Sequence, residues 1–253
     1  MTLLEQLAVL AAGFGSGILT STVGVASLLS FPVLVAVGLP PVVANASNTV
    51  GLTPGALSGA WGYRSELREH PGVAAAVLGT CAVGSVGGAV LLLALPDAVF
   101  EGVVPWLILG TCLLVGIQPR LSAGLRARRG EDVPDRLHMS PLTLGFGTLT
   151  GVYGGYFGAG SGVMMLAVLG LGTDLPFRIA NALKTLAVLS ANLVATLIFL
   201  VAADLDWRAV ALLAGGSIFG GYVGARIGRR LPPTLLRTSI VIAGIVAFVL
   251  MSR

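Results

Sequence analysis

The sequence predicts an all-α fold, a polytopic membrane helical bundle without a soluble domain, on three observations. Hydrophobic residues make up 55% of the 253 residues and charged residues only 10%, whereas soluble domains carry about 25% charged residues. Apolar runs of about 20 residues recur from end to end, and a helix of that length crosses a hydrocarbon core of about 30 Å. These runs lack the alternation of apolar and polar residues that is typical of membrane β-barrel strands.

The chain consists of two copies of one sequence unit. Gly24 corresponds to Gly160 and Asn45 to Asn181, and in both pairs the second number exceeds the first by 136. A Leu-Pro turn precedes each of the two asparagine-containing motifs. We therefore expect a single membrane domain over residues 1–253, divided into a first repeat at 1–118, a basic cytoplasmic linker at 119–140 and a second repeat at 141–253.

The first repeat opens with an apolar stretch at residues 3–38, which would be roughly 54 Å long as one helix at about 1.5 Å per residue. That length exceeds one crossing, and the small and polar residues at 21–24 divide it, so we predict a hairpin of two short helices. Three further spans are predicted at residues 42–63, 73–95 and 102–116.

The second repeat follows the same plan. It opens with a predicted hairpin at residues 141–172 that is broken around 154–162, and spans are expected at residues 177–201, 207–228 and 235–251. The two repeats together contain eight hydrophobic units, or about ten helices when both arms of each hairpin are counted.

The arginines predict how the chain lies across the membrane. They concentrate in the segments at 64–71, 119–140 and 226–237, which we expect on the cytoplasmic side. Acidic residues dominate the segments at 96–101 and 204–208, which should face outward. These positions require the two repeats to be inserted upside down relative to each other, with both termini outside. The net charge of +4 therefore indicates membrane topology rather than nucleic-acid binding.

Lys184 is the only lysine in the chain, and its counterpart in the first repeat is Asn48. It lies about seven residues into its predicted span, roughly 10 Å deep at the rise of an α-helix. An ionisable residue at that depth is costly and indicates a functional site. The alternative is that the side chain extends its ammonium back to the cytoplasmic interface.

The polar motifs around the paired asparagines predict an anion site near the starts of two oppositely inserted helices, where free backbone N–H groups favour negative charge. The candidate residues are Asn45, Asn48, Thr49, Asn181, Lys184 and Thr185. The spans contain no carboxylate, so we expect no metal site. The asparagines could alternatively serve only to hydrogen-bond neighbouring helices.

The glycine-rich breaks are the predicted turns of the hairpins, at Gly24 in the first repeat and at Gly158, Gly160 and Gly162 in the second. Glycine permits a sharp turn and lets backbone N–H groups approach an oxyanion, although close helix packing alone would also explain these residues. Neither histidine lies in a span, so the serine in the second break has no base and we expect no enzyme and no cofactor.

The whole chain resembles the TauE/SafE sulfite exporter family. The resemblance is carried by a Gly-rich hairpin, a Leu-Pro turn and an Ala-x-x-x-x-Thr helix start in each half. It is best over residues 158–162 and at Ala180 and Thr185, whereas residues 22–26 depart from the family's glycine pattern. Members of that family are thought to move sulfite, sulfonates, sulfoacetate and related small anions across the bacterial plasma membrane.

The resemblance implies a multi-pass plasma-membrane protein that acts as a secondary transporter, in the export direction, for a small sulfur-containing anion. Ser161 then joins the candidate substrate-binding residues as a hydrogen-bond donor. A passive anion channel and a transporter of a small carboxylate remain open as alternatives, and so does assembly into a homodimer. The expected partners are the anion and the lipid bilayer.

Overall fold

The computed structural model describes residues 1–127 and 137–227, and within them the chain forms ten α-helices and no strand. The helices are α1 (Leu3–Thr22), α2 (Ser27–Ala36), α3 (Pro41–Gly62), α4 (Arg64–Glu69), α5 (Pro71–Ala94), α6 (Asp97–Ala127), α7 (Pro141–Tyr156), α8 (Ser161–Gly172), α9 (Phe177–Ala202) and α10 (Trp207–Ile227). The all-helical prediction is confirmed. The predicted span at 235–251 lies outside the described residues.

Both predicted hairpins are present, as α1–α2 and α7–α8, and glycine explains where each chain turns. Gly24 has a φ of +87° and its counterpart Gly160 a φ of +80°, and Gly158 has a φ of +77°. This left-handed region is costly for residues with a Cβ. The same break therefore recurs at equivalent positions because both sequences provide glycine there.

Two connecting segments contain helix that was not predicted there. Residues 64–69 form the short helix α4, and α6 continues to Ala127, within the segment expected as a linker. Counting both hairpin arms predicted about ten helices, and ten are described. The agreement is numerical only, because α4 was not expected and the last predicted span is outside the described residues.

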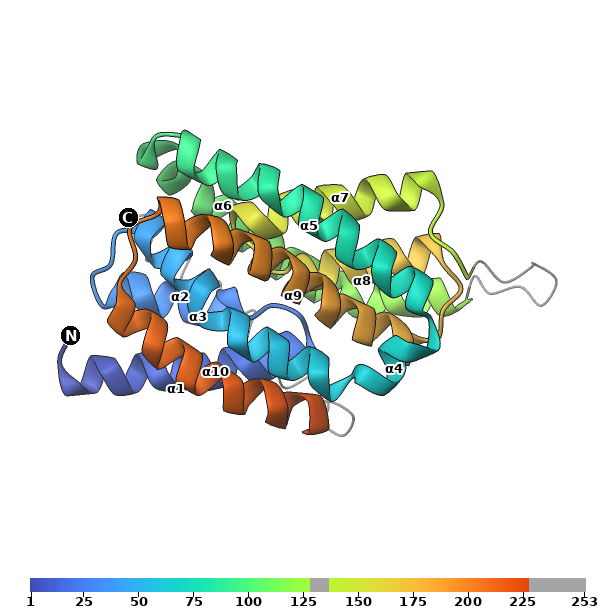
Figure 1. Cartoon of the computed structure of the whole chain (residues 1–253), viewed down its shortest axis with the longest axis horizontal. Helices are drawn as coiled ribbons and strands as arrows, with labels where there is room; N and C mark the ends of the chain where they lie inside the picture. Colours follow the sequence, from blue (N-terminus) through green and yellow to red (C-terminus); the bar gives the residue numbers. More distant parts are fainter. Residues whose placement is uncertain (128–136, 228–253) are drawn as a thin grey trace.

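Helices of one repeat pack mainly on helices of the other. α1 packs on α10, and its counterpart α7 packs on α5 (Figure 1). Glycines allow the close approach: a Cβ added at Gly84 or Gly88 of α5 would collide with the backbone of α7, at Thr148 O and Val152 O. The matching pair on α10, Gly220 and Gly224, meets the backbone of α1 in the same way. Such small-residue contacts are typical of helix association in lipid.

The central helices α3 and α9 pack on each other and carry the buried candidate residues Asn45, Asn48 and Lys184. In Figure 1, α1 and α3 begin at the left end of the bundle, whereas α7 and α9 begin at the right end. Equivalent helices thus run in opposite directions within the bundle. Insertion of the two halves in opposite orientations in a membrane stays a prediction.

The outer surface is apolar, as a membrane protein requires. Phe219 is 70% exposed and Leu197 60% exposed, and Trp61 and Trp207 are exposed near helix ends, where tryptophan commonly meets the membrane interface. Five of the described helices are long and apolar enough to cross a membrane by length and composition: α1, α5, the first part of α6, α9 and α10. α3 is not among these five, and most of its polar residues are buried.

Candidate functional site

Lys184 lies at the centre of the bundle. Its side chain is fully buried (0% exposed), so the ammonium does not extend to an interface. Nζ donates a hydrogen bond of 3.0 Å to the backbone carbonyl of Thr22, at the end of α1. No carboxylate forms an ion pair with this ammonium within residues 1–127 and 137–227. An ammonium in this position lacks the negative partner that burial of a charge normally requires.

The tips of the two hairpins touch beside this lysine. A Cβ built on Gly24 would lie 3.0 Å from Cα of Gly162 and 3.1 Å from Cδ of Lys184, and one built on Gly162 would lie 2.8 Å from Cα of Gly24. Gly162 is in the first turn of α8 and not in the hairpin turn, so its role differs from the predicted one. It lets the two tips and the lysine stem meet without intervening side chains.

Two asparagines on α3 connect that helix to both hairpins. Asn45 Nδ2 donates a hydrogen bond of 2.9 Å to the carbonyl of Tyr156, the last residue of α7. Asn48 Nδ2 donates one of 3.1 Å to the hydroxyl of Ser27, the first residue of α2. Both side chains are fully buried, and neither carbonyl oxygen, Oδ1, has a hydrogen-bond partner in the described part of the chain.

Asn181, the counterpart of Asn45, has a different environment. Its Nδ2 donates to the hydroxyl of Tyr63 over 3.1 Å, and that hydroxyl donates to the carbonyl of Ser21 over 3.1 Å. Tyr63 therefore joins α9 to the end of α1. Nothing in the sequence pattern pointed to Tyr63, because a tyrosine at the end of a span is ordinarily an interface residue.

The hydroxyl candidates are less available than predicted. Thr49 Oγ1 donates to the carbonyl of Asn45 over 3.0 Å and Thr185 Oγ1 to the carbonyl of Asn181 over 3.1 Å. Each hydroxyl proton is thus used within its own helix, and only lone pairs remain for a ligand. Ser161 is the first residue of α8 and is buried, 5% exposed, next to the hairpin turn.

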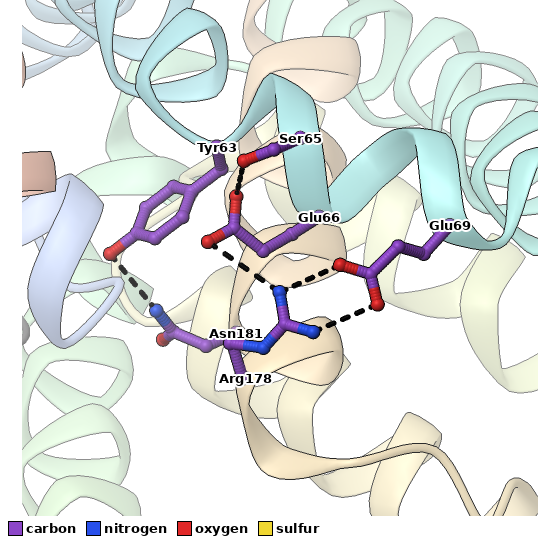
Figure 2. Close-up of polar contacts among 6 residues, drawn as sticks. All are labelled: Tyr63, Ser65, Glu66, Glu69, Arg178 and Asn181. Carbon is purple, nitrogen blue, oxygen red and sulfur yellow. Dashed lines mark hydrogen bonds and ion pairs between the residues drawn. The ribbon is translucent and has the colours of Figure 1, made fainter.

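An ionic cluster lies at the start of α9, around Arg178, six residues before Lys184 (Figure 2). Arg178 binds Glu69 through two hydrogen bonds of 2.8 Å, and its Nη1 lies 3.8 Å from a carboxylate oxygen of Glu66. Ser65 donates to the other oxygen of Glu66 over 2.6 Å, and the Glu66 side chain is 3% exposed. We call these four residues the Arg178 cluster. The hydrogen bond from Arg178 holds the pKa of Glu69 below its ordinary value.

Asn181 lies between this cluster and the buried lysine on α9. Arg178, Asn181 and Lys184 follow one another at intervals of three residues, so each is a neighbour of the next on the helix surface. Lys184, Asn45 and Asn48 each donate a hydrogen bond to a residue close to a hairpin tip, whereas Asn181 donates to Tyr63, nearer the Arg178 cluster. Besides the ammonium, the polar groups near the hairpin tips are amides, hydroxyls and backbone carbonyls, which are suited to hydrogen-bonding a small polar ligand.

Comparison with known proteins agrees with this architecture. The family model described as "Sulfite exporter TauE/SafE" matches residues 9–251. A "Probable membrane transporter protein" of Haemophilus influenzae is 31% identical over 232 residues, covering 91% of this chain and 88% of the relative. The "Probable membrane transporter protein YfcA" of Escherichia coli K12 is 26% identical over 233 residues, covering 91% and 83%. No solved structure matches the chain significantly.

Proposed function

Because this chain belongs to the sulfite exporter TauE/SafE family of multi-pass membrane transporters, we propose that it exports a small sulfur-containing anion across the bacterial plasma membrane as a secondary transporter. Sulfite, a sulfonate and a sulfoacetate-like ion are the expected substrates. The observation that carries the proposal is the complete burial of Lys184 with a backbone carbonyl as its hydrogen-bond acceptor.

The charge of the site favours an anion. Burial of an ammonium without a counter-charge is strongly unfavourable, and an oxyanion bound beside it would supply that charge. Lys184 Nζ has three hydrogens, and the described hydrogen bond to Thr22 uses one of them. The remaining two point to a ligand with several oxygen acceptors, such as a sulfite or sulfonate group.

The arrangement of the repeats supports an alternating-access mechanism. The hairpin tips meet at Gly24 and Gly162 beside the lysine, so movement of one repeat against the other would open the site to one side or the other. In Figure 1, α4, the end of α6, the start of α7 and the end of α10 gather at one end of the bundle. These elements adjoin the arginine-rich segments, which supports the assignment of that end to the cytoplasm.

The test is flux in proteoliposomes containing the purified chain, with a panel of sulfite, alkylsulfonates, sulfoacetate and small carboxylates. A carrier should show saturable flux and counterflow, whereas large single-channel currents would identify a pore. Preference for carboxylates over the sulfur anions would contradict the substrate class.

The variant Lys184→Met should reduce flux by about tenfold or more, because a hydrogen bond to a charged group is worth about 1.5–3 kcal/mol. Leu197→Ala on the same helix is the matched control, since Leu197 is 60% exposed on the outer surface and should leave flux unchanged. Unchanged transport by Lys184→Met would remove the lysine from the site.

A further inference from the structure

The carbonyl oxygen of Asn45 is a buried acceptor with a defined orientation. Asn45 Nδ2 faces the carbonyl of Tyr156 at 2.9 Å, and a carbonyl can only accept, so the amide cannot be turned round without placing two oxygens against each other. Oδ1 therefore points the other way, and in the described part of the chain it receives no hydrogen bond. Burial of such an oxygen without a donor is unfavourable.

Asn48 presents a second buried oxygen one turn along the same helix. Its Nδ2 contacts the hydroxyl of Ser27 at 3.1 Å, and Oδ1 receives no hydrogen bond from the described residues. Residues three apart share one face of a helix, so both amides lie on one face of α3. The Ser27 hydroxyl can donate or accept, so the oxygen and nitrogen of the Asn48 amide could exchange places. Asn45 cannot do so, and its Oδ1 remains the acceptor.

The two asparagines and Lys184 contact residues close to the same hairpin tips. Asn48 bonds to Ser27 at the start of α2, and Lys184 bonds to Thr22 at the end of α1, so both engage the first hairpin within a few residues of its tip. Asn45 bonds to the last residue of α7, directly before the second tip. A carbonyl oxygen repels an oxyanion and binds a hydrogen-bond donor. A ligand that satisfies both therefore needs an oxyanion group for the ammonium of Lys184 and a hydrogen-bond donor for the asparagine oxygens.

We propose that the transported solute carries, besides the oxyanion group that Lys184 binds, a hydrogen-bond donor that the asparagine oxygens of α3 recognise. The donor is a hydroxyl group, or an ammonium group in a zwitterionic amino-sulfonate. This inference rests on the proposed function and narrows the substrate class to hydroxy- or amino-substituted small sulfonates and related anions. A site that offers buried acceptors discriminates against a ligand lacking the donor, because the acceptors would stay unpaired in that complex.

Three sulfonates of nearly equal size test the proposal: 2-hydroxyethanesulfonate, 2-aminoethanesulfonate and propane-1-sulfonate, which end in a hydroxyl, an ammonium and a methyl group. Each competes against radiolabelled sulfite in proteoliposomes of the unaltered protein. At least one donor-bearing ligand should bind about tenfold or more tightly than propane-1-sulfonate. Equal competition by all three would overturn the proposal, and this measurement needs no variant that folds poorly.

Two variants separate this inference from the proposed function. Asn45→Leu, which keeps the number and branching of the side-chain heavy atoms, should lower the affinity ratio of donor-bearing ligands to propane-1-sulfonate to about one. Lys184→Met should weaken the binding of all three sulfonates by the same factor. Loss of affinity in Lys184→Met without discrimination by the unaltered protein would leave anion transport standing and refute donor recognition. Transport of propane-1-sulfonate that requires sodium and shows no preference would instead assign the oxygens to a cation and would also refute it.

Discussion

The contact between the two hairpin tips leads to a sharp prediction for Gly24→Ala. The substitution has two separable costs. Gly24 has a φ of +87°, and an L-residue in that region costs about 1–2 kcal/mol. The new Cβ would also lie 3.0 Å from Cα of Gly162 and 3.1 Å from Cδ of Lys184. Contact with backbone on one side and the lysine stem on the other forces the tips apart.

Gly38→Ala is the matched control, because Gly38 has a φ of +92° but no atom within 4 Å of its added Cβ. Both variants should therefore lose stability by about 1–2 kcal/mol from the backbone alone. Only Gly24→Ala should also displace Lys184 and reduce transport, by about tenfold or more, since misplacement by a few tenths of an ångström weakens hydrogen bonds to the ligand.

The assays are thermal denaturation in detergent and anion flux in proteoliposomes, with flux normalised to folded protein. Equal transport by the two variants at equal stability would show that the tip contact has no role in transport. Retained transport by Gly38→Ala is required for the comparison to hold, and its loss would mean that backbone strain alone explains the effect.

Three further outcomes follow from other contacts. The hydrogen bond from Arg178 holds the pKa of Glu69 in the folded protein below its ordinary value of 4.5. The ion pair therefore stabilises the fold above pH 4.5, and this stabilisation is lost as the pH falls through the lowered pKa of the folded state. Glu69→Gln should make the free energy of unfolding fall less steeply as the pH is lowered below 4.5. An unchanged pH dependence would contradict the pairing. Tyr63→Phe removes the hydroxyl between α1 and α9 and should cost about 1 kcal/mol in thermal denaturation, whereas an unchanged melting temperature would exclude that link. Gly88→Ala should lower the melting temperature because its Cβ meets the α7 backbone, whereas Gly79→Ala, with open space around it, should not; equal melting temperatures would refute tight packing of α5 on α7.

The Arg178 cluster shows why part of the site could not be predicted. Arg178 and Glu69 are 109 residues apart in the chain, and charged residues near span ends ordinarily face water or lipid headgroups. Their pairing depends on residues 64–69 forming α4 and packing on α9, which is a tertiary contact without a local signal. The repeat also suggested equal roles for Asn45 and Asn181, but their partners are Tyr156 and Tyr63.

The positions of the helices and of the hairpin turns could be predicted from the sequence, because they depend on residues that are close together in the chain. Apolar runs set the helices, and glycine at equivalent positions set the left-handed turns at Gly24 and Gly160. The lone lysine within an apolar run predicts a functional site, and that role stays a prediction. The tertiary structure decided which groups meet: Lys184 with Thr22, and the α3 amides with the two hairpins. Backbone conformation responds to neighbours in the chain, whereas hydrogen-bond partners in a bundle depend on how distant helices pack.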